Sequence, residues 1–209
     1  MKLSVAVLMA VLSVCASSMA GSTKYVSIYQ NPRAGQTDFS GKKVVCFVII
    51  PAEELRSARE ETVTAELEKR GVDAIPGYII LPRQLVNDRE KSKEFLKKAG
   101  VNLAVLIRLL GDETETSPAT VISTGWYTQP QYANFWGYWN YSWSSVTMIE
   151  PPRTDRVITL ETLIYSIDKD ELLWAGRSET TNPKDIRKFV QELAKEAGKS
   201  LRKAGLLPK

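Results

Sequence analysis

Three apolar runs, at residues 44–50, 74–81 and 103–110, constrain the fold of this chain most, because stretches of helix length separate them. Each run has the length of a strand, and the first is typical of a strand buried on both faces. Crossovers of this length join parallel strands through right-handed connections. The pattern therefore predicts a β-α-β-α-β unit with three parallel strands.

The separating stretches carry the start and stop signals of helices. Apolar residues recur at helical spacing from Leu55, and Gly71 is a natural C-terminal stop. Asn87 or Asp88 can cap a second helix, which would stop at Gly100. One helix is therefore expected in each crossover.

The C-terminal part predicts a hairpin followed by a helix. Residues 156–167 and 172–180 have strand character, with turn residues between them. Asn182 and Pro183 are typical of a helix start, and an i, i+3, i+4, i+7 apolar stripe follows up to Gly205. The fold class is thus α/β, a single domain with a mixed sheet in the order β-α-β-α-β-(aromatic insert)-β-β-α.

Residues 1–20 are typical of a bacterial secretory signal peptide. A Met–Lys start precedes an apolar run at residues 3–14 and a group of small residues that ends at Ala20. The apolar run is too short to cross a bilayer comfortably, which takes roughly 20 residues. We therefore expect cleavage after Ala20, an extended lead-in at residues 21–43 and an α/β domain at residues 44–209.

Cys15 offers a second route for the same N-terminus. Bacterial lipoproteins are cut before a lipidated Cys that follows a small residue, a position that Val14 fits less well than Gly, Ala or Ser would. The sequence thus predicts an exported protein, either periplasmic or anchored to the outer membrane by a lipid on Cys15. Cys46 lies in the first apolar run and is expected to be an inert core cysteine.

Composition excludes several classes of function. The chain has no His, which excludes Ser–His–Asp and Cys–His catalysis and His-ligated metals, and its two Cys are too few for a Cys-rich metal site. The net charge of +4 is mild, and acidic and basic residues are interleaved, unlike the gathered positive charge of a nucleic-acid binder. The glycine spacing at residues 35–42 departs from a phosphate-binding loop. We expect no cofactor, no metal, no nucleic acid and no nucleotide.

The most unusual segment is an uncharged insert at residues 118–149. Half of the 18 aromatic residues of the chain fall within 18 consecutive positions of it, and loops of this length in compact domains are usually functional or disordered. The aromatic residues, taken as candidate binding residues, are Trp126, Tyr127, Tyr132, Phe135, Trp136, Tyr138, Trp139, Tyr141 and Trp143.

Four interpretations of the insert stay open. It could be a β-hairpin whose rings fill the core, with Trp139, Tyr141 and Trp143 on one face, or a docking patch for a protein partner. It could also be a platform that stacks on glycans such as peptidoglycan, or a contact with membrane headgroups. Stacking on single-stranded nucleic acid is excluded, because the segment has no Lys or Arg.

Charged residues near the third apolar run are further candidates. Arg108 lies inside the run and needs an acidic partner if it is buried, for which Glu161 and Glu179 are available. The three acids that follow the run could form an acidic rim or the acid–base pair of a glycosidase. They are Asp112, Glu113 and Glu115.

Several phrases of the chain resemble a family of exported bacterial proteins, lipoproteins among them, that has no established activity. They are residues 38–44, Arg56-x-x-Arg59–Glu60, residues 88–90, the Gly/Tyr/Trp-rich insert, residues 161–165, and Leu-Trp-Ala-Gly-x-Ser-Glu-Thr-x-Asn-Pro at residues 173–183. The resemblance covers most of the chain from about Asp38 and implies no catalytic residue. The element order is also similar to small α/β domains of envelope accessory proteins, such as the N-terminal domain of TolB, which bind partners.

The sequence as a whole favours a non-enzymatic binding or accessory protein of the bacterial envelope. Its expected partner is an envelope protein, peptidoglycan or a membrane surface, contacted through the aromatic segment. One alternative is an oligomeric outer-membrane pore or secretion component, with residues 119–128 and 139–148 as a membrane hairpin. A remote alternative is a glycosidase that uses only carboxylates.

Overall fold

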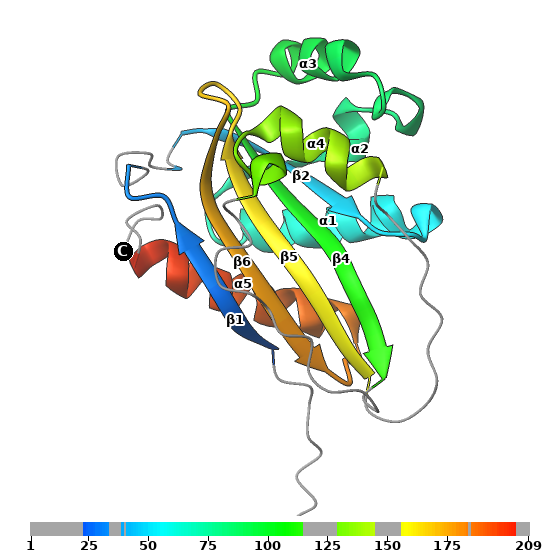
Figure 1. The fold of residues 1–209 in the computed structure, drawn as a ribbon, viewed down its shortest axis with the longest axis vertical. Helices are drawn as coiled ribbons and strands as arrows, with labels where there is room; N and C mark the ends of the chain where they lie inside the picture. The colour runs from blue at the N-terminus through cyan, green and yellow to red at the C-terminus, as the bar shows by residue number, and fades with distance from the viewer. Residues whose placement is uncertain are drawn as a thin grey trace, which may run out of the picture.

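A six-stranded mixed sheet forms the middle layer of the molecule (Figure 1), with strand order β1-β6-β5-β4-β2-β3. The computed structural model describes residues 23–33, 39, 41–114, 129–144, 156–183 and 185–203. The strands are β1 (Thr23–Gln30), β2 (Lys43–Ile49), β3 (Asp73–Pro76), β4 (Leu103–Thr114), β5 (Arg156–Ser166) and β6 (Glu171–Thr181).

The strand directions confirm the predicted fold class. Strand β2 pairs in parallel with both β3 and β4, as the helix-length crossovers require. Strands β5 and β6 form the expected antiparallel hairpin, and β5 also pairs antiparallel with β4. The molecule is therefore a mixed α/β domain in which one hairpin extends a parallel unit.

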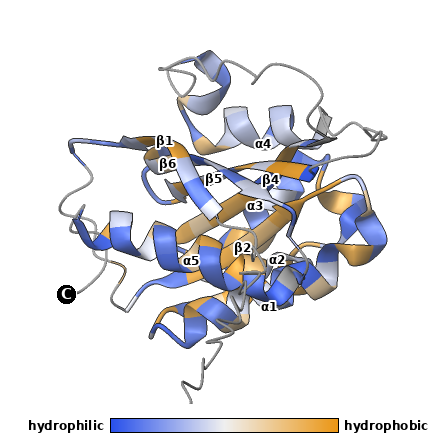
Figure 2. Cartoon of the chain, turned by 90° about the horizontal axis from the view of Figure 1, so that it is seen from below, coloured by the Kyte–Doolittle hydropathy of each residue, from blue (hydrophilic) through white to orange (hydrophobic). Residues whose placement is uncertain are grey.

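Helices cover both faces of the sheet. They are α1 (Arg56–Glu68), α2 (Gly77–Ile80), α3 (Arg89–Lys98), α4 (Phe135–Ser144) and α5 (Ile186–Lys203). Helices α1 and α5 lie on one face and α4 on the other, and Figure 2 shows hydrophilic residues on the helices and hydrophobic ones along the sheet. No helix among the residues described is both long and apolar enough to span a membrane.

The predicted helix signals are confirmed at three of the four places that the structure describes; the stop at Gly205 lies outside the described residues. The Asp88 carboxylate accepts the Lys91 N–H at the start of α3, and Gly71 and Gly100 follow α1 and α3 in the left-handed conformation. The predicted start at Asn182 is wrong. Helix α5 begins at Ile186, and the side chain of Asp185 accepts its first N–H groups, from residues 187 and 188.

Two further expectations need correction. The polar lead-in contains β1, an edge strand whose Tyr25 packs edge-on against Trp174 with ring centroids 5.4 Å apart. The run at residues 74–81 is a strand only as far as Pro76 and then turns into α2. The turn is tight, because a Cβ atom at Gly77 would overlap the Phe47 ring and lie 2.9 Å from the Cys46 carbonyl oxygen.

The core consists of two clusters, one on each face of the sheet. Cys46 and Val48 of β2 face α1 and α5, whereas Phe47 and Ile49 face α3 and α4, as the period of two in a strand requires. This confirms that β2 is buried on both faces. Cys46 has a free, fully buried thiol, and burial raises its pKa to about 12.

Two glycine substitutions should change stability in opposite directions. Gly77→Ala forces overlap with backbone and an aromatic ring, and we expect it to lower the free energy of unfolding by about 1–3 kcal/mol. Gly198→Ala, inside α5, meets only the Arg202 guanidinium at 3.7 Å and should raise it by about 0.5–1 kcal/mol. Urea unfolding measures both, and equal midpoints for the two variants would contradict the described packing.

Candidate functional site

The described part of the aromatic insert is helical and forms part of the core. A 3-10 turn at Pro130–Tyr132 leads into α4, so the predicted hairpin is wrong for these residues. The rings at positions 132, 135, 136, 139 and 143 follow helical rather than strand spacing. The membrane hairpin of the pore alternative does not fit positions 139–144, which are helical; residues 119–128 and 145–148 of that hairpin lie outside the described residues.

The nine aromatic candidates fall into three groups. Five are buried against the sheet face that α4 covers: Tyr132, Phe135, Trp136, Tyr138 and Trp139. Tyr141 and Trp143 are partly exposed. Trp126 and Tyr127 lie outside the described residues. Of the four interpretations of the insert, the core-filling one fits the five buried rings, in a helix instead of a hairpin.

A row of three charged residues crosses the sheet beneath α4. Arg108 on β4, Glu161 on β5 and Arg177 on β6 are register partners on adjacent strands. Arg108 Nη1 lies 3.1 Å from Glu161 Oε1, and Arg177 Nη2 lies 4.0 Å from Glu161 Oε2. Glu161 is therefore the partner that Arg108 was expected to need, whereas Glu179 pairs with Lys24.

Two tyrosines of the insert complete this cluster. The Tyr132 hydroxyl donates to Glu161 Oε2 at 3.0 Å, and the Tyr138 hydroxyl donates to Oε1. Burial and the Glu161 carboxylate hold the pKa of both hydroxyls well above their usual range. Because Glu161 is fully buried and both of its oxygens are engaged, the cluster fastens the insert to the sheet.

A second buried ion pair lies within α1, and the end of α4 packs against it. Arg56 Nε donates to Glu60 at 2.8 Å, and Glu60 also accepts the N–H groups of Val48 and Tyr78. Burial raises the pKa of Glu60, and Arg56 opposes that rise. The Trp143 ring lies 5.2 Å from the Arg56 guanidinium carbon, within cation–π range. In the motif Arg56-x-x-Arg59–Glu60, two residues, Arg56 and Glu60, therefore make structural contacts. The third, Arg59, lines a cleft on the other side of the sheet.

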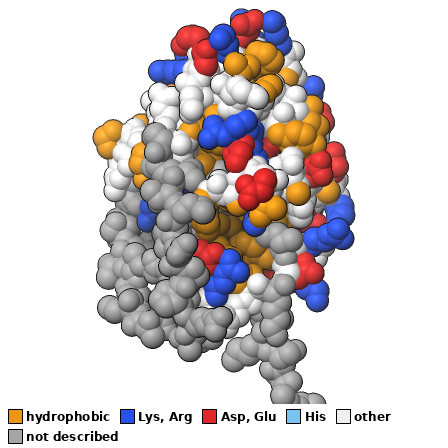
Figure 3. All heavy atoms as spheres, turned by 90° about the vertical axis from the view of Figure 1, so that its right-hand side faces the viewer, with side chains coloured by type: hydrophobic (Ala, Val, Ile, Leu, Met, Phe, Trp, Pro, Cys, Tyr) orange, Lys and Arg blue, Asp and Glu red, His pale blue; other side chains and the backbone are white. Residues whose placement is uncertain are grey.

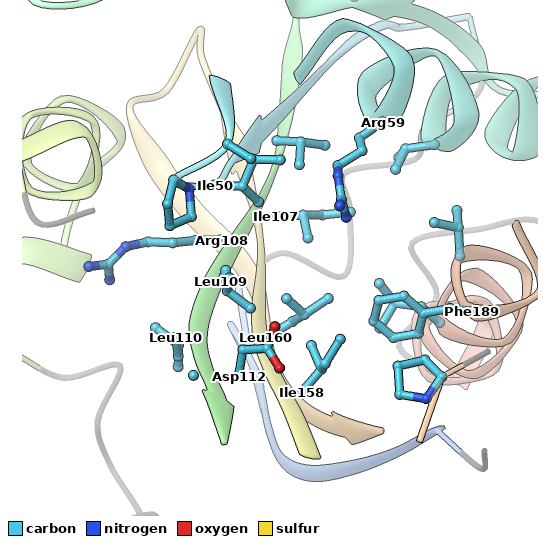
Figure 4. A pocket seen from close by; sticks show the side chains of 18 of the residues that line it. Ile50, Arg59, Ile107, Arg108, Leu109, Leu110, Asp112, Ile158, Leu160 and Phe189 are labelled. Atoms are coloured by element: carbon cyan, nitrogen blue, oxygen red, sulfur yellow. The ribbon is translucent and has the colours of Figure 1, made fainter. Parts of the chain in front are cut away.

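The opposite face of the sheet carries an apolar cleft between α1 and α5, with a volume of about 580 Å³ (Figure 4). Strands β2, β4 and β5 form its floor, α1 and α5 form its main walls, and residues 50–52 and Tyr141 of α4 also border it. Its main apolar lining is Val48, Ile50, Val63, Ile107, Leu109, Ile158, Leu160, Phe189, Val190 and Leu193. The size and lining are those of a small-molecule site.

Charged groups lie around the cleft. Arg156 Nε donates to Asp112 Oδ1 at 2.6 Å, so this acid is engaged in an ion pair. Arg59 is half-buried and makes no hydrogen bond or ion pair with any residue that the structure describes; burial, and to a lesser extent Arg156, lowers its pKa. Figure 3 shows an apolar hollow with charged side chains beside it, and in Figure 4 Arg108 points away from it.

The sequence signals for this cleft were present but indirect. Ile107 and Leu109 alternate with Arg108, which separates the two faces of β4, and Arg59 interrupts the inward side of α1. Of the acids proposed for a glycosidase, only Asp112 has a described side chain at the cleft. The side chain of Glu113 and the whole of Glu115 lie outside the described residues.

Removing a carboxylate charge should have a large effect at Glu161 and a small one at Asp112. Glu161→Gln leaves Arg108 buried without its counter-ion, and we expect a loss of about 3–5 kcal/mol of unfolding free energy. Asp112→Asn breaks a solvent-accessible pair and should cost at most about 1 kcal/mol. Chemical denaturation of both variants measures the difference. A loss of unfolding free energy in Glu161→Gln no larger than in Asp112→Asn would contradict the role of Glu161 in fastening the insert to the sheet.

Comparison with known proteins assigns no family. No family model matches the chain, and no curated protein matches it. Among solved structures, the PelC dodecamer from Paraburkholderia phytofirmans aligns with a TM-score of 0.45 and 8% identity, over 90% of this chain and 99% of that one. The lipoprotein GNA1162 from Neisseria meningitidis aligns with a TM-score of 0.41 and 8% identity, over 78% of this chain and 99% of that one. Both structural similarities are weak, and neither identifies a ligand.

Proposed function

We propose that this protein is an exported, non-catalytic binding protein of the bacterial envelope, and that the cleft between α1 and α5 is its ligand site. The observation that carries the proposal is the cleft itself: about 580 Å³ of apolar space with a few charged groups beside it. Binding sites for small molecules combine these two properties. The ligand is then an envelope component with a substantial apolar part.

The state of the carboxylates supports a non-catalytic role. A general acid or base must reach its substrate. Asp112 is paired with Arg156, Glu161 is buried beneath α4, and Glu60 is buried in its pair with Arg56. Each of the three carboxylates is engaged by an arginine, which favours binding over hydrolysis.

The N-terminal pattern supports export to the envelope. Residues 1–20 combine a positive start, a short apolar run and small residues, which is the layout that signal peptidase recognises. A protein delivered to the envelope meets lipids, peptidoglycan and other exported proteins. The apolar cleft suits the first of these best.

Cell fractionation with intact-mass measurement tests the location. We expect a mature chain that begins at Gly21 in the periplasmic fraction, and a Cys15→Ser variant should give the same mature mass. A chain that begins at an acylated Cys15 would replace the periplasmic location by an outer-membrane anchor. Full-length protein retained in the cytoplasm would contradict the envelope role itself.

Filling the cleft should weaken binding of a neutral apolar probe. Leu109 lines the cleft and is only partly buried, so Leu109→Trp puts a larger side chain into the cavity without repacking the core. N-phenyl-1-naphthylamine, titrated by fluorescence, should bind the variant at least about tenfold more weakly than the wild type.

The matched control is Ile79→Trp, at an exposed position on α2 that does not line the cleft. This variant should bind the probe like the wild type. Circular dichroism and thermal unfolding confirm that both variants are folded. Equal probe affinity in the wild type and a folded Leu109→Trp variant would show that the cleft is not the binding site.

A further inference from the structure

We propose that the cleft binds a long-chain fatty acid, with the alkyl chain along the sheet and the carboxylate on Arg59. The inference rests on the proposed function, because it names the ligand of the same cleft. It is carried by two observations: the apolar floor, and an arginine beside it that makes no hydrogen bond or ion pair with the described residues. Asp112, whose charge acts on this arginine, is itself paired with Arg156.

The floor of the cleft suits an extended apolar chain. Val48 on β2, Ile107 and Leu109 on β4, and Ile158 and Leu160 on β5 lie on the same face of three adjacent strands. Neighbouring strands are about 4.8 Å apart, so this surface is roughly 10 Å wide before the helices are added. Each methylene buried there should tighten binding by about fourfold.

Arg59 has the position and the chemistry to bind an anion. Its guanidinium is half-buried in the wall of the cleft, where loss of hydration is costly unless an acceptor replaces the water. The acids next to it on its own helix are engaged elsewhere: Glu60 pairs with Arg56, and Glu61 accepts the Tyr78 hydroxyl. The planar donor fork of arginine matches a carboxylate in two parallel hydrogen bonds.

The charge of the site selects a carboxylate over a phosphate monoester. Arg156 also lines the cleft, but the negative charge of Asp112 offsets its positive charge. The net charge of these three side chains is therefore one positive charge, that of Arg59. A carboxylate carries one negative charge at neutral pH and balances it. A phosphate monoester carries about 1.5 to 2 negative charges at neutral pH, and it would leave an excess of negative charge beside the apolar walls.

Competition against the neutral probe tests the assignment. Myristate should displace N-phenyl-1-naphthylamine at least about tenfold more effectively than 1-tetradecanol, which has the same chain and no charge. Laurate, two methylenes shorter, should bind roughly fifteenfold more weakly than myristate. Arg59→Gln should weaken myristate by about tenfold or more and leave 1-tetradecanol unchanged.

Two variants control for indirect effects of the substitution. Arg202→Gln removes an exposed arginine of α5 that does not line the cleft, and should bind myristate like the wild type. Arg59→Lys keeps the charge without the planar fork and should retain part of the preference for myristate over the alcohol. Circular dichroism shows whether each variant is folded.

The outcomes that would overturn the inference differ in whether the proposed function is also contradicted. If myristate and the alcohol compete equally, or Arg59→Gln leaves myristate unchanged, the charge assignment fails and the cleft remains a binding site. If lysophosphatidylglycerol competes better than myristate, the ligand is a phospholipid rather than a fatty acid. If none of these ligands displaces a probe that binds in the cleft, the fatty acid is wrong; if the probe itself does not bind, the proposed function fails too.

Discussion

A strand that is apolar on both faces must be covered twice, and the central strand β2 imposes this on the whole molecule. Cys46 and Val48 are buried under α1 and α5, while Phe47 and Ile49 are buried under α3 and α4. Burial of each large side chain contributes roughly 1.5–3 kcal/mol, so neither face can be left to solvent. The aromatic insert completes the second cover, which α3 of the parallel unit provides only in part.

The two covers differ in how tightly they close. On the α4 face, two tyrosine hydroxyls and two arginines surround the carboxylate of Glu161, which fixes the helix by directed contacts as well as by ring packing. On the other face, β2 ends at Ile49 while β4 continues to Thr114 with only β5 beside it. Helices α1 and α5 leave part of this longer floor uncovered, and the cleft lies there.

The local features of the fold could be predicted from the sequence, and the long-range ones could not. The parallel strands follow from apolar runs at crossover spacing. The need of Arg108 for an acidic partner follows from its place in an apolar run, but the choice of Glu161 over Glu179 required the structure. Strand β1 was missed, because a polar edge strand lacks the apolar run that marks the central ones. One interpretation of the insert was a hairpin, because a strand would place Trp139, Tyr141 and Trp143 on one face. The spacing of the buried rings instead fits the helix α4. The cleft depends on how α1 and α5, two helices far apart in the sequence, are placed over the sheet, which no local pattern encodes.

The central claim is that one face of the sheet is closed by the insert while the other binds ligand. Methyl NMR spectra of the folded protein, recorded with and without myristate, test it most directly. The account predicts shifts for the methyl groups of Ile107, Leu109 and Leu193, which line the cleft, and none for Leu106 and Leu163 beneath α4. Shifts confined to Leu106 and Leu163, with the cleft methyl groups unchanged, would contradict it.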